Sequence, residues 1–238
     1  MEIQKQLLVP PVKPVDKLLV FLDTETTGRG PKDRLVQVAY KVGNLPPVCE
    51  LFKAPLPVSL DAMTVNHITN KMLIDKPPFQ GSYLHLMLHE IFHRQKGILV
   101  AHNADFDLEM LKKEDIYPDQ YICTMKVARH LDTEDRMSNY KMQYLRYYWE
   151  IEADVVPHTA HGDIVVLEKI YEKLAELTTV DEMIHVSKEP FLLRKLTFGK
   201  YKEIPVKDIP RDYLIWLRRQ ENIEGDLAYT LDYYINLG

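Results

Sequence analysis

The sequence has few cysteines and no long apolar segment, and both absences narrow the class of protein. Only Cys49 and Cys123 occur in 238 residues, which are too few for a disulfide scaffold. No run reaches the roughly 18 apolar residues of a membrane span, and the first residues lack the apolar stretch of a signal peptide. We therefore expect a cytoplasmic protein with no membrane partner.

An excess of positive charge is also missing. The chain has 30 Lys and Arg against 35 Asp and Glu, a formal net charge of -5. This balance gives no overall attraction for nucleic acid, but it does not exclude a nucleic-acid enzyme. A site built from several carboxylates lowers the net charge while its bound cations supply the positive field.

The apolar pattern predicts a mixed α/β fold. Short apolar or alternating runs predict strands over residues 18–22, 35–42, 48–52, 98–103 and 121–125. Helical spacing predicts helices over residues 61–69, 83–92, 105–115, 126–131, 141–149 and 161–174. Three strands followed by alternating helices and strands are typical of a mixed sheet flanked by helices.

Composition divides the chain into three parts. Residues 1–16 contain Pro10, Pro11 and Pro14, which predict an extended N-terminal arm. Residues 17–178 carry the alternating pattern and form the expected main domain. A boundary is predicted near residues 178–186, and residues 186–238 then predict a small α+β domain with two short helices, over 212–220 and 224–236.

Two carboxylates end the first buried strand, in FLDTETTG at residues 21–28. Asp23 and Glu25 stand two positions apart, so their side chains point to one face of the strand, and Thr24 points to the other. Like charges this close repel each other unless a cation lies between them. The alternative is an ordinary solvated strand end, and the pattern by itself leaves both open.

A second acidic stretch, AHNADFD at residues 101–107, also follows a predicted buried strand. Ligand sites of α/β sheets collect where strands end, so Asp105 and Asp107 are both candidate ligands. The alternative for either acid is a place in the first turn of a helix, which favours negative charge.

The third pattern, H-x4-D, occurs three times, at His102/Asp107, His130/Asp135 and His158/Asp163. Spacing cannot choose among them, but context can. His130 falls inside a predicted helix, and Asp135 falls in a polar loop. His158 instead lies on a predicted loop before an apolar helix that carries Asp163, where a histidine can move and the acid is fixed.

Together, FLDTETTG, AHNADFD and the last H-x4-D resemble the DEDD superfamily of 3′–5′ exonucleases, in its histidine branch (DnaQ-like), over residues 18–174. The tyrosine branch would need Y-x3-D, which none of the 14 tyrosines provides. The resemblance implies a ribonuclease-H-like fold with a five-stranded mixed sheet. It also implies hydrolysis of nucleic acid from the 3′ end to nucleoside 5′-monophosphates.

The resemblance assigns a role to each motif residue. Two Mg²⁺ or Mn²⁺ ions would be held by Asp23, Glu25, Asp107 and Asp163, and His158 would be the general base. Carboxylates without cysteine suit such hard cations. The substrate-binding residues would be Thr26, His67, Ile68, Asn103 and Phe106. For Phe106, simple core packing is an equal alternative, and His102 is interpreted as structural.

The tail TFGKYKEIPVKDIPRDYLIWL, together with YICTMKVARHL, resembles the exodeoxyribonuclease X group within that superfamily. Residues 185–211 carry seven Lys and Arg against three acids, which indicates either a phosphate-facing surface or an ordinary solvated face. The expected partner is DNA with a 3′ end, single- or double-stranded. The alternatives are a 3′–5′ exoribonuclease and a proofreading subunit that acts with a DNA polymerase.

Overall fold

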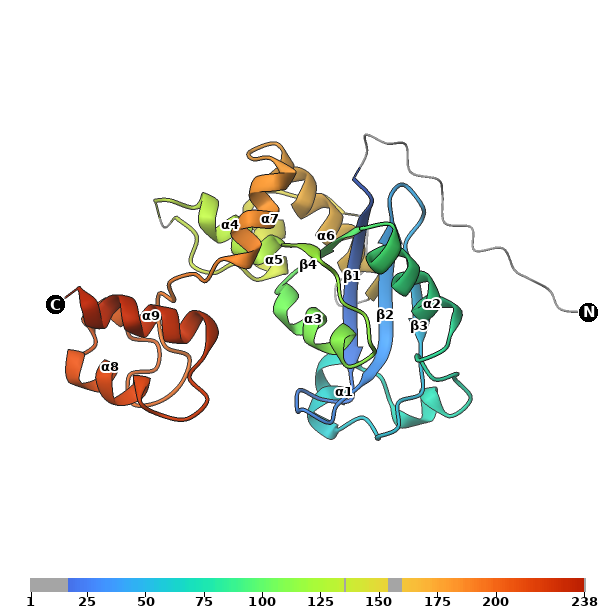
Figure 1. Ribbon diagram of the computed structural model, residues 1–238, viewed down its shortest axis with the longest axis horizontal. Coiled ribbons are helices and arrows are strands. Elements are labelled where there is room, and N and C mark those ends of the chain that lie inside the picture. The colour runs from blue at the N-terminus through green and yellow to red at the C-terminus, as the bar shows by residue number, and fades with distance from the viewer. Residues whose placement is uncertain (1–16, 135, 154–159, 238) are drawn as a thin grey trace, which may run out of the picture. The chain divides into compact units, whose positions relative to one another are not determined.

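A computed structural model of the protein describes residues 17–134, 136–153 and 160–237, without the side chains of residues 160 and 161. The chain divides into two compact units (Figure 1); the first ends at Ser187 and the second begins at Lys188. His158 and Asp135, and the predicted arm over residues 1–16, lie outside the described residues.

A five-stranded mixed sheet forms the centre of the first unit. Its strands are β1 (Leu19–Thr26), β2 (Leu35–Val42), β3 (Val48–Leu51), β4 (Ile98–Ala101) and β5 (Gln120–Cys123), in the order β3-β2-β1-β4-β5. β1 pairs antiparallel with β2, and β2 pairs antiparallel with β3, whereas the β1–β4 and β4–β5 pairs are parallel. This confirms the predicted fold class.

β1 is central because its apolar run is buried on both faces. Val20 and Leu22 are fully buried on one face, and Phe21 is 3% exposed on the other. The strand continues past its apolar run to Thr26 and includes the two acids that were predicted to end it, because its polar half still pairs with β2. Asp23 and Glu25 therefore lie in the part of β1 that pairs with β2, and not beyond its end.

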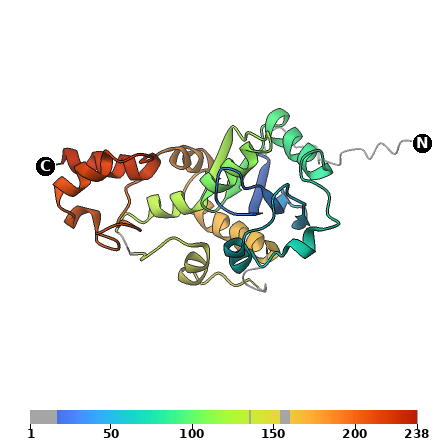
Figure 2. The same cartoon turned by 90° about the horizontal axis from the view of Figure 1, so that it is seen from below.

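Helices cover both faces of the sheet (Figure 2). α2 (Tyr83–His89) and α3 (Ala104–Lys112) pack on the face of Val20 and Leu22. The opposite face is covered by α4 (Thr124–Leu131), α5 (Met142–Tyr148), α6 (Ala160–Ala175) and α7 (Val180–Lys188). The remaining elements of the unit are α1 (Leu60–Asn66), a 3₁₀ turn (Asn70–Leu73) and a π-helical turn (Glu90–Arg94) that continues α2.

α7 lies in the interval that the sequence pattern left as a domain boundary. Met183 is fully buried, and Ile184 and Val186 are nearly so, in the same core as α6. The hydroxyl of Ser187 accepts a hydrogen bond of 2.8 Å from the backbone amide of Cys123. Packing thus carries the first unit past residue 178, to Ser187.

The second unit has a small core of its own. It contains a 3₁₀ turn (Val206–Asp208), α8 (Arg211–Arg218) and α9 (Gly225–Asn236), which pack around Leu196, Val206, Ile209, Leu214, Leu217 and Leu231. Its described residues form two isolated β-bridges and no strand, so the observed β content is smaller than the predicted α+β domain implies. No helix of the described residues in either unit is long and apolar enough to cross a membrane.

Candidate active site

The polar half of β1 presents two acids on one face. Asp23 and Glu25 are half-buried, and the threonines that alternate with them, Thr24 and Thr26, are buried. Burial raises the pKa of Asp23 well above its usual value, and the charges of Asp107, Glu25 and Asp163 raise it further. Burial also raises the pKa of Glu25 to about 7, with Asp163 adding to the shift and Arg29 opposing it. These groups therefore share one electrostatic environment.

Asp107 reaches this environment from the opposite face of the sheet. It lies in the first turn of α3, directly after β4, and is only 3% exposed. Its Oδ1 accepts a buried hydrogen bond of 2.7 Å from the hydroxyl of Thr24. Burial raises the pKa of Asp107 to about 7, although the hydrogen bonds from the Thr24 hydroxyl and backbone amide work against that shift. Thr24 thus holds Asp107 toward the end of β1.

Asp163 comes from the other side, in the first turn of α6. The amide Nε2 of Gln143, on α5, donates to its Oδ1 over 3.3 Å. The charge of Asp163 raises the pKa of both Asp23 and Glu25, which shows that it lies close to them. The structure therefore places in one electrostatic environment the four acids that the family resemblance assigns to the metal site.

The four carboxylates have the chemistry of a site for divalent cations. Burying several like charges together is costly unless a cation compensates them. Hard oxygen donors suit Mg²⁺ or Mn²⁺. No three acidic, histidine or cysteine side chains of the described residues stand in ion-binding geometry. The assignment of a cation site therefore rests on the chemistry of the four carboxylates and on the repulsion between them.

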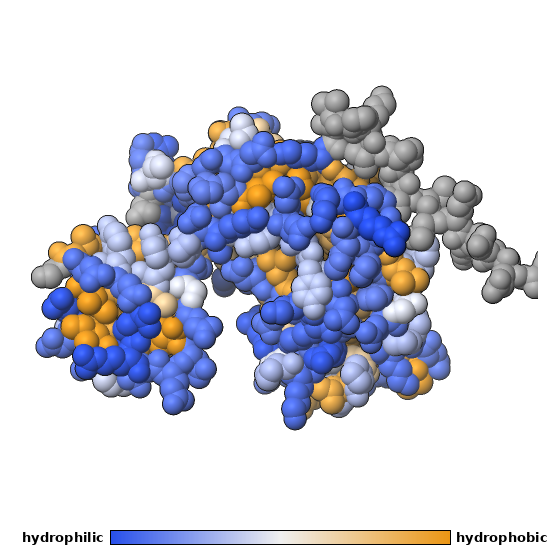
Figure 3. Space-filling model, viewed as in Figure 1, coloured by the Kyte–Doolittle hydropathy of each residue, from blue (hydrophilic) through white to orange (hydrophobic). Residues whose placement is uncertain are grey.

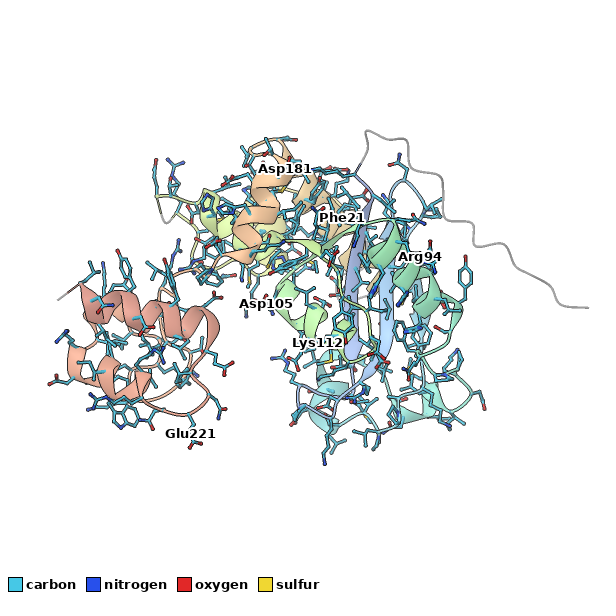
Figure 4. All side chains as sticks on the ribbon, viewed as in Figure 1. Phe21, Arg94, Asp105, Lys112, Asp181 and Glu221 are labelled. Carbon is cyan, nitrogen blue, oxygen red and sulfur yellow. The ribbon has the colours of Figure 1, made fainter. Side chains whose placement is uncertain are left out.

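Asp105 makes a different set of contacts, although it is only two residues from Asp107. Asp105 is labelled in Figure 4, and its carboxylate is 57% exposed. It lies 3.3 Å from Nζ of the buried Lys126. Lys126 also donates to the backbone carbonyl of Ser187 over 3.4 Å. Asp105 therefore belongs to a contact that holds α4 and the end of α7, as expected for a structural acid.

His102 is built into the core of the first unit. Its Nδ1 lies 2.9 Å from the hydroxyl of Thr124, and its Nε2 lies 2.9 Å from the carbonyl oxygen of Tyr140. Burial lowers the pKa of His102 to about 4, so the ring is neutral at pH 7. With both ring nitrogens occupied, His102 joins three chain segments and has no nitrogen left for a proton transfer.

The predicted substrate residues have unequal surroundings. His67 is exposed, and so is Asn103, which adopts a left-handed backbone conformation (φ 62) just before α3. Phe106 is half-buried against the core, and the hydroxyl of Thr26 donates to the carbonyl oxygen of Gly28. Ile68 is 2% exposed and packs in a small apolar cluster, which fits support of the neighbouring His67 better than direct contact with a nucleotide.

Three residues of this region make contacts that the sequence motifs did not predict. Thr24, Gln143 and Lys126 make the contacts that separate Asp107 and Asp163 from Asp105. Strand alternation shows that Thr24 points away from Asp23, but only the packing of α3 on that face shows what it meets. The contacts of Gln143 and Lys126 depend on how helices pack and have no local sequence pattern.

We expect Thr24→Val to weaken catalysis by about 10- to 100-fold, the usual cost of losing a residue that orients a metal ligand. Valine keeps the branched shape but removes the donor to Asp107. The rate of DNA degradation, measured across a series of Mg²⁺ concentrations, should show a higher half-saturation concentration. Thr24→Ser is the matched control and should remain close to wild type. An unchanged Mg²⁺ dependence in Thr24→Val would argue against this role.

The fold and the acidic cluster define the class of the protein. A family model described as Exonuclease matches residues 20–171, and the chain belongs to this family of DnaQ-like 3′–5′ exonucleases. Exodeoxyribonuclease 10 of Escherichia coli (strain K12) is 30% identical over 234 residues, which cover 92% of this chain and 99% of that protein. These findings confirm the family that the sequence motifs indicate.

Further matches concern parts of the chain. The DNA polymerase III subunit epsilon of Treponema pallidum (strain Nichols) is 34% identical over 98 residues, 39% of this chain and 43% of that protein. A solved structure, Exonuclease X in complex with 5′ overhanging duplex DNA, is 26% identical with a TM-score of 0.52, and the match covers 71% of this chain and 99% of that one. Residues 189–237 match a second family, described as "Putative quorum-sensing-regulated virulence factor".

Proposed function

We propose that the protein is a divalent-metal-dependent 3′–5′ exodeoxyribonuclease that releases nucleoside 5′-monophosphates. The observation that carries the proposal is the convergence of Asp23, Glu25, Asp107 and Asp163, four acids from three elements whose electrostatic interactions raise the pKa of Asp23 and Glu25. The similarity to an exodeoxyribonuclease over 92% of the chain supports DNA as the substrate.

In this mechanism the four acids would hold two Mg²⁺ or Mn²⁺ ions, which would supply activation of a water molecule and stabilisation of the negative charge on the phosphate. Thr24 and Gln143 hold two of the acids in place. His158, two residues before the first residue of α6, takes the proton from the attacking water.

The residues around the acids are proposed to receive the terminal nucleotide. His67 and Asn103 are exposed and can contact its sugar or base. Phe106 offers one side of its ring, and Thr26 contributes mainly through its backbone, because its hydroxyl already donates to Gly28. These contacts fix the 3′ end so that the last phosphodiester meets the carboxylates.

Two other functions remain as alternatives. An exoribonuclease would use the same acids, and only the recognition of the 2′-hydroxyl would differ. A proofreading subunit would act with a DNA polymerase, and the Treponema relative is named as a polymerase subunit, but that match covers 39% of this chain. We favour a role in DNA repair or end processing. We also propose the cytoplasm as its compartment, where the bacterial relatives find their DNA.

The proposal is tested with the purified chain and single-stranded DNA and RNA of one sequence, labelled at the 3′ or the 5′ end. We expect Mg²⁺-dependent release of labelled mononucleotide from 3′-labelled DNA at the start of the reaction, and stepwise shortening of 5′-labelled DNA. EDTA should stop both. Faster degradation of RNA would favour the exoribonuclease, and early release of a 5′ label would overturn the proposed polarity.

A further inference from the structure

The second unit carries three aromatic side chains in mutual contact, which we call the aromatic ladder: Tyr201, Tyr213 and Trp216. The ring centroids of Tyr201 and Tyr213 lie 4.7 Å apart, and those of Tyr213 and Trp216 lie 5.2 Å apart. Both tyrosines are half-buried against the small core, whereas Trp216 is 52% exposed. The core of this unit therefore does not enclose the ladder.

A tight turn brings a cation to the ladder. Gly199 has a φ of +75, and a Cβ at this position would lie 2.8 Å from the hydroxyl of Tyr213, so the turn packs directly against that hydroxyl. The turn places Nζ of Lys200 5.3 Å from the ring centroid of Tyr201. It also leaves Phe198 44% exposed. Aromatic rings and a positive charge are thus built into one surface.

Positive charge is concentrated in the same part of the unit. Residues 194–219 contain eight Lys and Arg against three acids, a net charge of +5, although the whole chain has -5. Residues 220–237 contain four acids and no Lys or Arg, a net charge of -4. In Figure 3 the visible face of this unit mixes hydrophobic with strongly hydrophilic side chains. One of the eight cations, Arg218, pairs with Asp232 of the acidic segment, and the segment of the ladder keeps an excess of positive charge that is complementary to a polyanion.

We propose that the aromatic ladder is a second DNA-binding site, which stacks unpaired bases of a single strand while Lys200 and neighbouring cations contact its phosphates. This inference rests on the proposed function, because it takes DNA as the substrate. Single strands are favoured over duplexes because only unpaired bases expose their faces to an aromatic ring, and such stacking tolerates any sequence. The net charge of +5 favours DNA over a protein partner as the occupant.

A strand held at the ladder gains an advantage at the active site. Holding one part of a strand raises the effective concentration of its end at the other site, provided that the strand can reach both. The ladder should therefore matter for long single strands and be irrelevant for very short ones. This length dependence separates it from the contacts of the terminal nucleotide.

The test measures binding of the full chain to labelled oligo(dT) of 4 to 40 nucleotides by fluorescence anisotropy, in EDTA to prevent cleavage. We expect Trp216→Ala to weaken binding of the long strands roughly tenfold or more. Lys200→Glu, which removes the cation beside Tyr201 but none of the three rings, should also weaken it. Tyr233→Ala is the matched control, because Tyr233 is 42% exposed on α9 in the acidic segment. Trp149→Phe leaves Trp216 as the sole tryptophan, whose fluorescence should be quenched by oligo(dT).

Two outcomes would overturn the ladder site. One is unchanged binding of long oligo(dT) in both Trp216→Ala and Lys200→Glu. The other is an equal loss of affinity for blunt duplex DNA, which would exclude base stacking. Cleavage of a four-nucleotide strand with Mg²⁺ tests the proposed function separately, since that substrate needs only the acidic site. Wild type should cleave it, and Trp216→Ala should do so at the same rate.

Discussion

Asp107→Ala is expected to reduce exonuclease activity by more than about a thousandfold, whereas Asp105→Ala should stay close to wild type. A carboxylate that holds a catalytic cation contributes several kcal/mol to the stabilisation of the transition state, and each 1.36 kcal/mol is a factor of ten. Asp107 is buried, accepts a hydrogen bond from the Thr24 hydroxyl and interacts with the charges of Asp23 and Glu25. The measurement is the initial rate of mononucleotide release in saturating Mg²⁺.

Asp105→Ala is a matched control, because the same substitution is made two residues away in the same helix. Asp105 is paired with the buried Nζ of Lys126, so its removal costs stability by leaving that charge with one partner fewer. Any loss should therefore appear in the midpoint of thermal unfolding and not in the rate. If Asp105→Ala were the inactive variant, the motif would be aligned to the wrong acid.

In thermal stability the two variants should rank in the reverse of their order in activity. Without divalent cations, Asp107 is one of several neighbouring carboxylates that repel each other, so its removal relieves part of that repulsion. We expect Asp107→Ala in EDTA to unfold no earlier than wild type, despite its loss of activity. An inactive variant with unchanged stability would show that the defect is chemical and not a failure to fold.

Local sequence pattern was enough to predict the arrangement of β1. Alternation along a strand places Asp23 and Glu25 together, and the buried run before them identifies a central strand of the sheet. The family motifs then supplied the order of the acids along the chain, and the comparisons confirm the family. The roles of individual acids stay a prediction until variants are measured.

Other features depend on packing between distant segments and could not be predicted. Local sequence signals do not reveal that β1 pairs antiparallel with β2 as far as Thr26. Thr24 and Asp107 are 83 residues apart, and their hydrogen bond exists only because α3 packs on one face of the sheet. Ile68 belongs to a motif that suggests substrate contact, yet its surroundings make it part of an apolar cluster.

The general base is the assignment for which sequence spacing did not decide, and it predicts a second large effect. His158→Ala is expected to lower the rate by about 10² to 10⁴, the usual contribution of a general base. His158 lies outside the described residues, but two residues further on the chain enters α6. The first turn of α6 carries Asp163.

His130 lies on α4, a helix that carries none of the four acids. It is exposed in the last turn of α4, and its charge is not among the causes of the raised pKa of Asp23, Glu25 or Asp107. His102, the third histidine with the same spacing, is buried with both ring nitrogens in contact with protein oxygens. We therefore expect His130→Ala to have close to the wild-type rate, so that it serves as the control for removing an imidazole.

A pH series separates a general base from a metal ligand. The rate of His158→Ala should recover in part as the pH rises, because hydroxide in the solvent then replaces the missing proton acceptor. Its half-saturating Mg²⁺ concentration should remain near that of wild type, whereas Asp163→Ala should need far more Mg²⁺ or show no activity. If His158→Ala lost Mg²⁺ affinity as severely as Asp163→Ala, His158 would be a ligand. If His130→Ala were the inactive protein, the base would have to be sought on α4.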